Sequence, residues 1–477
     1  MAKKILLIRT HKDLNAGGAV PPLGLLYLAS SIFRKFNGQY DVKILNTGLN
    51  GVSLDGELAR FQPDILGISA MTCESDLMGQ AASGAKRLSK KCVVVAGGPH
   101  ASLAKESLLE DANIDFAVIG EGEETLPELL NALENKADLS GVPGIAYRKE
   151  GRPALNPARE PIRDLQAVNI IPRAWGLIDI KAYSGYANWN GVCRNKYYAA
   201  VLTSRGCPFK CFFCRSRDTF GSGFRGRRPE DVVDELDFLN KKLGVREIHI
   251  FDDVFNYDRQ RAMDICRLII DRKLKIDIAF PNGLRADLMT PDMVDMFKAA
   301  GVYKINYGIE SASVALQKTL GKGLDIGRVK ETIDRTVKAG IITAGYFIFG
   351  FPGESRDDIR ETIDFAVRSP LDNAYFFKFT DFSTFNKPAV TGQRDLSDLH
   401  FHSQEGNGAG IPAAELNGFI LTAQRRFYCG FKRLWRAFLR TPRKAAFFGS
   451  LLSVFSLIIS SYLVSKLSAD KETGVRP

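Results

Sequence analysis

Short apolar runs alternate with stretches of helical periodicity through the first 150 residues of this chain, and this alternation restricts the fold more than any other sequence feature. The apolar runs predict strands at 4–8, 42–45, 65–69, 93–96 and 116–119, with helices at 24–36, 54–61, 76–88 and 103–109. Strands this apolar, separated by helices, form a parallel sheet covered on both faces. Residues 1–150 are therefore predicted to form a doubly wound α/β domain, which binds ligands at the carboxyl ends of its strands.

A second series of the same kind follows. It predicts strands at 198–203, 247–251, 276–280, 304–308, 343–349 and 374–379, and helices at 232–243, 261–272, 291–300, 326–339 and 359–367. Six strand–helix repeats predict a partial or full β/α barrel over residues 198–385, with the active face on the loops that follow the strands. Residues 151–197 contain four prolines and little periodicity and are interpreted as a linker. Residues 386–477 are predicted to form a helical C-terminal region.

The net charge of +11 is concentrated in one part of the chain. Residues 416–469 include nine Lys and Arg and no Asp or Glu, so the rest of the chain is nearly neutral. This distribution argues against a nucleic-acid partner, and the basic tail needs its own explanation. The apolar run at 5–8 is too short for the core of a secretory signal, which predicts a cytoplasmic location.

Three of the eight cysteines, Cys207, Cys211 and Cys214, fall in one loop directly after the first barrel strand. This spacing brings three thiolates around one metal centre. A four-iron cluster normally takes four cysteine ligands, so three would leave one iron open for catalysis. The alternatives are a structural zinc with a fourth ligand from elsewhere, or three unrelated cysteines. The chain has only five His and none near the loop, which disfavours the zinc site.

The loop resembles the signature of the radical S-adenosylmethionine (SAM) enzymes, including the aromatic Phe213 before the last cysteine. Gly308-Ile-Glu310-Ser resembles the acidic motif of that family, and Gly350-Phe-Pro352-Gly353-Glu resembles its Gly-Pro motif. The resemblance implies that the three cysteines ligate a 4Fe-4S cluster whose open iron chelates SAM. It also implies an electron donor of the flavodoxin or ferredoxin type, and cleavage of SAM to methionine and a 5′-deoxyadenosyl radical.

The same resemblance implies roles for residues around SAM. Phe213 would lie against the adenine, and Glu310 would bond the ribose or the methionine amine. Gly350, Pro352 and Gly353 would form the loop on the adenine side. From the residues alone, Glu310 is equally a surface carboxylate, and the Gly-Pro stretch is equally a tight turn.

Two further polar positions lie at the active end of the predicted barrel. Asp252-Asp253 closes the second strand, and Arg285 follows the third. Asp253 and Arg285 are predicted to contact cofactor, because an Arg at this edge can bind a carboxylate in bidentate fashion. A structural Arg–Asp pair between adjacent loops is the alternative.

The N-terminal region resembles the Rossmann-like cobalamin-binding domain found before many radical SAM barrels. The resemblance rests on Pro21-Pro22-Leu-Gly24, Gly97-Gly98-Pro99-His100 and Gly120-Glu121-Gly122-Glu123. The residues predicted to contact cobalamin are Pro22, Gly24, Thr72, Gly97, Gly98, Gly120 and Gly122.

The broader cobalamin family has an Asp-x-His-x-x-Gly motif that supplies a histidine ligand to cobalt, and this chain lacks it. Arg9 stands in place of the Asp and Leu14 in place of the Gly. His11 is therefore predicted to be a loop residue rather than a ligand, and His100 a loop or tail contact. Cobalamin is expected to bind without a protein histidine, as is usual in the radical subfamily.

These resemblances imply a cobalamin-dependent radical SAM enzyme that methylates an unactivated carbon of a small-molecule or lipid substrate. One alternative is an oxidative cyclase or rearrangement enzyme similar to the anaerobic cyclases of tetrapyrrole biosynthesis. Another is a non-enzymatic iron–sulfur electron carrier or sensor. A methylthiotransferase needs three more cluster cysteines in the first domain, which offers only Cys73 and Cys92. The aromatic run 375–382 is either an apolar face near the site or a buried strand.

The tail suggests a membrane partner. One helical face is apolar, with members at Phe431, Leu434, Trp435, Phe438 and Leu439. The basic residues fall largely elsewhere, which is typical of an interfacial helix. The uncharged segment 445–465 is long enough to cross a bilayer, although it is rich in serine. We expect attachment to the cytoplasmic face of a membrane; the alternative is a helical hairpin packed on the protein itself.

Overall fold

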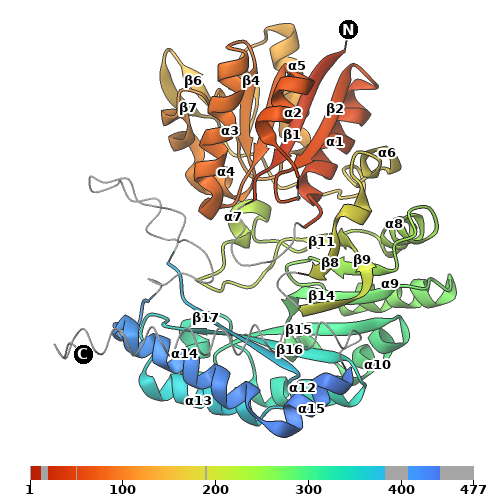
Figure 1. The fold of residues 1–477 in the computed structure, drawn as a ribbon, viewed down its shortest axis with the longest axis vertical. Helices are drawn as coiled ribbons and strands as arrows, with labels where there is room; N and C mark the ends of the chain where they lie inside the picture. The colour runs from red at the N-terminus through yellow and green to blue at the C-terminus, as the bar shows by residue number, and fades with distance from the viewer. Residues whose placement is uncertain (1, 12–19, 50, 188–190, 382–406, 441–477) are drawn as a thin grey trace.

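The computed structural model describes residues 2–11, 20–49, 51–187, 191–381 and 407–440. Its two large sheets are a seven-stranded sheet in the order β2-β1-β3-β4-β5-β6-β7 and a six-stranded sheet in the order β10-β13-β14-β15-β16-β17. The N-terminal sheet lies above the second one, with the short helix α7 (Ser216–Phe220) between them (Figure 1).

The first sheet has a parallel core with helices on both faces, as predicted. Its parallel strands are β1 (Lys3–Arg9), β2 (Tyr40–Asn46), β3 (Ile65–Ser69), β4 (Val93–Gly97) and β5 (Phe116–Val118). Its helices are α1 (Leu23–Phe36), α2 (Leu54–Phe61), α3 (Ser75–Leu88), α4 (Gly98–Ala104) and α5 (Gly122–Asn135). Alternate residues of β1 point to opposite faces: Ile5 and Leu7 join the core under α1 and α5, whereas Leu6 packs with α2 and α3.

Two features of this sheet differ from the prediction. The antiparallel strands β6 (Ile145–Lys149) and β7 (Arg152–Leu155) extend it past residue 150. They form a hairpin because Glu150 and Gly151 both adopt positive φ, as a tight two-residue turn requires. Helix α4 begins at Gly98, and a 3-10 turn (Lys105–Glu110) occupies much of the predicted helix 103–109.

The segment 151–197 connects the two sheets but is more structured than the linker interpretation implied. Besides β7 it contains helix α6 (Pro172–Trp175) and a hairpin of β8 (Ser184–Ala187) and β9 (Gly191–Tyr197). Trp175 is fully buried and donates to Glu235 of the barrel. Burial of this aromatic ring fastens the segment to the second sheet.

The second sheet is the predicted partial barrel. Its strands are β10 (Ala199–Val201), β13 (Glu247–Ile250), β14 (Asp277–Leu284), β15 (Val302–Glu310), β16 (Ile342–Phe349) and β17 (Asn373–Lys378), all parallel and in chain order. The matching helices are α8 (Pro229–Lys241), α9 (Arg259–Asp271), α10 (Pro291–Ala299), α12 (Ile326–Lys338) and α13 (Arg356–Arg368). Because the strands are parallel, their carboxyl ends lie along one edge of the sheet, and the loops that follow them lie at that edge.

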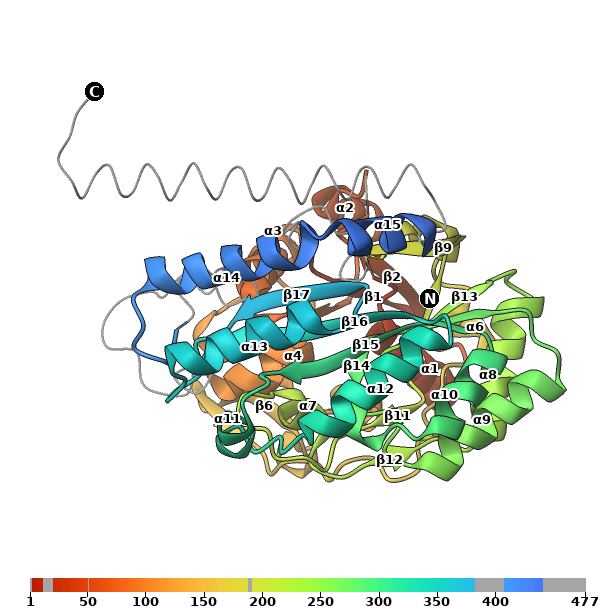
Figure 2. The same ribbon diagram turned by 90° about the horizontal axis from the view of Figure 1, so that it is seen from below.

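The C-terminal region contributes α14 (Ala413–Tyr428) and α15 (Phe431–Arg440), which lie along β17 and α13 (Figure 2). A helix is present where the amphipathic helix was predicted, and two of its arginines bond to the barrel. Arg433 donates to the carbonyls of Val367 and Ser369, and Arg436 donates to that of Pro370. These carbonyls lie in the last turn of α13 and directly after it, where the helix supplies no hydrogen-bond donor. The two arginines supply the missing donors.

Two residues of the predicted apolar face are exposed instead. Trp435 is 55% exposed and Leu439 is 59% exposed. Among the helices that the structure describes, none combines the length and hydropathy needed to cross a membrane. The uncharged segment 445–465 lies outside the described residues.

Candidate active site

The three cysteines lie in the loop that runs from β11 (Ser204–Arg205) to α7. Cys207 and Cys211 are half-buried and Cys214 is exposed, and all three thiols are free. A hollow of about 410 Å³ beside the loop is lined in part by Cys211 and Cys214. Burial, together with the charges of Asp253 and of the other two cysteines, raises the pKa of the Cys207 thiol to about 11. A nearby cation would favour the Cys207 thiolate, because an opposite charge stabilises the ionised form.

The segment at Leu320 and Gly321 packs against the cysteine loop. The amide of Phe212 donates to the carbonyl of Leu320 at 3.2 Å. Gly321 has φ +64°, and a Cβ there would lie 2.7 Å from the carbonyl oxygen of Lys210. Only glycine combines this backbone conformation with so close an approach. Gly321 was not predicted as a site residue, because its role depends on a neighbour more than a hundred residues away in the sequence.

Glu310 lies at the end of β15 in a left-handed conformation, with φ +66°. For a residue with a side chain this backbone state costs of order 1–3 kcal/mol and is often found at functional sites. Its carboxylate is buried and pairs with Lys322 at 2.7 Å. Glu310 is therefore not the surface carboxylate of the alternative interpretation. Burial raises the pKa of Cys211, and the nearby charge of Lys322 opposes that rise, which places this pair close to the cysteine loop.

Arg285 reaches the same place from the end of β14. Its guanidinium lies 3.7 Å from the ring centre of Phe209 in the cysteine loop and pairs with Asp287 at 2.8 Å. The Arg–Asp pair of the alternative interpretation exists, but within one loop. The buried Nη1 of Arg285 has no hydrogen-bond partner among the described residues. A buried donor of this kind is costly unless a ligand satisfies it.

The Gly-Pro stretch packs against Phe213 of the cysteine loop. The rings of Phe213 and Phe351 lie 5.3 Å apart within a small apolar cluster. Gly350 and Gly353 adopt positive φ, and Glu354 accepts from the amides of Gly350 and Phe351. The carbonyl of Gly350 also accepts from Gly408, so the C-terminal region closes one side of this loop. Pro352 contacts the same segment, since a Cβ at Gly408 would lie 2.8 Å from its ring.

The two aspartates after β13 hold the start of the cysteine loop. Asp252 accepts from the backbone of Thr203 and from the hydroxyls of Thr203 and Ser204. Asp253 accepts from the amide of Gly206 at 3.2 Å, next to Cys207. Burial, together with the charge of Asp252, raises the pKa of Asp253 to about 6. Both aspartates therefore act on the backbone that carries the cysteines.

The five glycines that were predicted to contact cobalamin divide into two groups. Gly24, Gly97 and Gly120 leave room, because a Cβ at these positions would meet nothing closer than 3.8 Å. Gly98 and Gly122 instead pack inside their own domain, where a Cβ would lie 2.6 Å from the Ser69 hydroxyl and 3.0 Å from Leu28, respectively.

The other predicted residues of the first domain are largely buried. Pro22 precedes α1, and Thr72 opens the 3-10 turn after β3. His100 lies in the first turn of α4 rather than in a loop, and burial lowers its pKa to about 4. The helix begins earlier than predicted because Gly98, with positive φ, turns the chain directly out of β4. His11 follows β1 and lies 3.9 Å from Glu74.

A buried ion-pair network that was not predicted from the sequence joins the two sheets. Arg205 pairs with Glu121 at 2.7 Å and with Glu123 at 2.6 Å, and Arg225 pairs with Glu121 at 2.8 Å. Both glutamates belong to the Gly120–Glu123 motif, and Arg205 is two residues before Cys207. The network therefore holds the cysteine loop against the carboxyl edge of the first sheet. The only available signal was two glutamates within a glycine-rich strand end.

Two family profiles match the chain. The radical SAM superfamily matches residues 201–366, and the B12 binding domain matches residues 13–130. The chain is 33% identical, over 76% of its length and 76% of the relative, to an uncharacterized methyltransferase of Pyrococcus horikoshii. It is 27% identical, over 91% of its length and 78% of the relative, to the anaerobic magnesium-protoporphyrin IX monomethyl ester cyclase of Rubrivivax gelatinosus.

A solved structure shares the fold. The radical SAM methyltransferase TsrM from Kitasatospora setae, with cobalamin and a 4Fe-4S cluster bound, aligns with a TM-score of 0.65 and 21% identity. The alignment covers 79% of this chain and 75% of that one. The predicted architecture, a Rossmann-like B12 binding domain followed by a partial β/α barrel and a helical C-terminal region, is confirmed.

Proposed function

Because the chain belongs to the radical SAM superfamily and carries a B12 binding domain, we propose that it methylates an unactivated carbon of a small-molecule or lipid substrate. Its cofactors are a 4Fe-4S cluster, SAM and cobalamin. When bound, they supply reductive cleavage of SAM and a transferable methyl group. The observation that carries the proposal is the buried Arg205–Glu121 contact, which holds the cysteine loop beside the carboxyl edge of the first sheet, in the B12 binding domain.

The residues around the cysteine loop fit the cluster and SAM. Three free thiols in one loop form a donor set suited to iron. The unsatisfied Nη1 of Arg285 fits a carboxylate such as that of SAM. The Glu310 carboxylate, held by Lys322, offers an acceptor for the methionine amine or the ribose.

We assign the remaining contacts by position. Phe213 and the Gly350–Gly353 loop would bind the adenine, where their packed rings exclude water. Asp253 would act on the cluster indirectly, through the backbone of Gly206. In the first domain, Gly24, Gly97 and Gly120 are the open positions that fit a close approach by cobalamin. Gly98 and Gly122 would support that surface from inside the domain.

An oxidative cyclase is the second candidate function. The cyclase relative aligns with 91% of this chain, more of it than the methyltransferase relative does. Both reactions begin with hydrogen abstraction, so the site described above serves either. The fate of the carbon radical separates them.

We further propose that α15 attaches the enzyme to the cytoplasmic face of a membrane. Trp435 and Leu439 are exposed on this helix and are suited to the lipid interface. Arg433 and Arg436 bind barrel carbonyls, so apolar contact rather than these charges would drive attachment. In vesicle sedimentation, the Trp435→Ser/Leu439→Ser protein should pellet less than wild type. The control Leu88→Ser, which alters an exposed leucine on α3, should pellet like wild type; equal pelleting of all three would contradict attachment through α15.

Label transfer tests the methyltransferase proposal. The enzyme is reconstituted anaerobically with iron, sulfide and cobalamin, then incubated with dithionite, a cell extract containing small molecules and lipids, and SAM carrying a trideuterated methyl group. We expect 5′-deoxyadenosine and a product that has gained the labelled methyl group, detected by mass spectrometry. A product that has lost hydrogen without gaining label would identify the cyclase instead. Absence of 5′-deoxyadenosine would refute both.

A further inference from the structure

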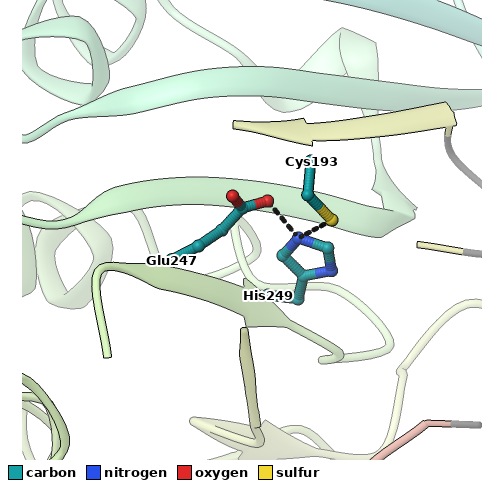
Figure 3. A group of neighbouring side chains, drawn as sticks. All are labelled: Cys193, Glu247 and His249. Carbon is teal, nitrogen blue, oxygen red and sulfur yellow. Dashed lines mark hydrogen bonds and ion pairs between the residues drawn. The ribbon is translucent and has the colours of Figure 1, made fainter. Parts of the chain in front are cut away.

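A cluster of three potential metal ligands lies at the opposite end of the barrel from the cysteine loop. Glu247 and His249 are alternate residues of β13, so their side chains point to the same face of the strand (Figure 3). Cys193 approaches them from β9, the second strand of the hairpin in the connecting segment. All three residues are buried, with Cys193 at 1%, Glu247 at 0% and His249 at 2% exposure.

The three donors converge on a single point. One nitrogen, one oxygen and one sulfur all lie within 4.8 Å of one another. His249 Nε2 is 2.8 Å from Glu247 Oε1 and 3.9 Å from Cys193 Sγ. A tetrahedral metal with bonds of about 2.0–2.3 Å separates its donors by roughly 3.3–3.8 Å. Shifts of less than about 1 Å along these two contacts would therefore admit an ion.

The geometry is unlike that of a catalytic thiol–imidazole–carboxylate relay. In such a relay the carboxylate and the nucleophile contact different nitrogens of the imidazole ring. Here Glu247 and Cys193 both approach Nε2 of His249. Because both partners contact the same ring nitrogen, a proton cannot pass from one to the other across the ring. A metal ion between the three donor atoms, in contrast, would bind all of them at once.

Neighbouring groups orient the three donors. The ring of Tyr198 stacks on His249 with the ring centres 4.2 Å apart. The backbone amide of Asn195 donates to Glu247 Oε2 at 2.7 Å, and the Tyr303 hydroxyl donates to Oε1 at 2.6 Å. Metal sites commonly have such a surrounding shell, which fixes ligand orientation.

We propose that Cys193, Glu247 and His249 form a second metal site, which binds a Zn²⁺-type divalent cation and is separate from the cysteine loop. Mixed sulfur, nitrogen and oxygen donors suit Zn²⁺ rather than Mg²⁺ or Ca²⁺. Binding releases the Cys193 thiol proton to solvent, and the thiolate and the Glu247 carboxylate then supply two negative charges next to the ion and the buried Lys304. Because all three ligands are buried, the role of the metal is structural. It links the β8–β9 hairpin, through Cys193, to β13.

Cobalt substitution tests the site without relying on activity. The full-length protein with Cys207, Cys211 and Cys214 all changed to Ala, free of cobalamin, is treated with one equivalent of Co²⁺. We expect a thiolate-to-cobalt charge-transfer band in the near ultraviolet and intense visible bands of tetrahedral Co²⁺. Adding Cys193→Ala should abolish the charge-transfer band, and adding Cys266→Ala, which removes another buried thiol, should leave it unchanged. A band that survives Cys193→Ala, or no band in the folded protein, overturns the proposal.

Elemental analysis of the iron-loaded protein gives a second measurement if the triple variant does not fold. Wild type should contain one zinc per chain, and Cys193→Ala should lose it at least tenfold while retaining iron. Cys266→Ala should keep both metals. Equal zinc in wild type and Cys193→Ala would exclude the site. SAM cleavage is independent of this result, so failure here leaves the proposed function unaffected.

Discussion

Nη1 of Arg205, two residues before Cys207, lies 2.7 Å from Oε1 of Glu121 at the start of α5. Both side chains are almost fully buried, at 3% and 4% exposure. The contact joins the cysteine loop of the barrel to the glycine-rich edge of the B12 binding domain. Its placement indicates that these two loops are held together by charge as well as by packing.

Removing Arg205 should therefore destabilise the protein strongly. In Arg205→Met the carboxylates of Glu121 and Glu123 stay buried with fewer partners, and we expect the free energy of unfolding to fall by about 3–5 kcal/mol. The matched control is Arg228→Met, which breaks the exposed Arg228–Asp231 pair and should change stability little. Denaturant unfolding measures both. Equal effects of the two substitutions would show that the buried network does not hold the domains.

The cluster assignment predicts a sharp division among the cysteines. Replacing Cys207, Cys211 or Cys214 by Ala should lower the iron content and abolish formation of 5′-deoxyadenosine. The other five cysteines should be dispensable for both: Cys73, Cys92, Cys193, Cys266 and Cys429. Cys266→Ala is the closest control, since Cys266 is buried in α9. Production of 5′-deoxyadenosine by Cys207→Ala would mean that the radical chemistry has been assigned to the wrong loop.

Gly321 and Gly323 form a natural pair for testing how the cysteine loop is supported. Both have left-handed φ, +64° and +60°, so an Ala at either costs about 1–2 kcal/mol in backbone strain. At Gly321 the new Cβ also meets the Lys210 carbonyl at 2.7 Å, whereas at Gly323 it meets nothing within 4 Å. We expect Gly321→Ala to lose more stability and to take up less iron than Gly323→Ala. Indistinguishable iron contents would remove Gly321 from the site.

Glu354 should make stability depend on pH. Burial raises the pKa of its carboxyl from 4.5 to about 7, although two backbone amides oppose the shift. Between these values the folded chain binds the proton more tightly than the unfolded chain, so stability falls as the pH rises, by up to about 3 kcal/mol.

Glu354→Gln cannot ionise, and it should lose less stability than wild type between about pH 5 and pH 8. Urea unfolding across this range measures the difference. Parallel pH profiles for the two proteins would show that Glu354 does not titrate in this window.

Much of the fold could be predicted from local patterns. The bounds predicted for β3 and α2 match the structure, because a short apolar run or a 3.6-residue period is visible within the segment itself. The order of the barrel strands followed from the strand–helix alternation. The β6–β7 hairpin was missed because its apolar run, Ile145 to Tyr147, is only three residues long and its turn depends on the positive φ of Glu150 as well as of Gly151.

The three cysteines, Phe213 and the Gly-Pro stretch were recognisable because their signal lies in short-range spacing. Spacing does not show which distant residues meet. Arg205 and Glu121 are 84 residues apart, and only the packing of one sheet against the other brings them together. Likewise, periodicity identified the two faces of α15, but the unsatisfied carbonyls at the end of α13 decided that Arg433 points inward and Trp435 outward. A local sequence period determines which side chains share a face, whereas the direction of that face is determined by the partners that the tertiary structure supplies.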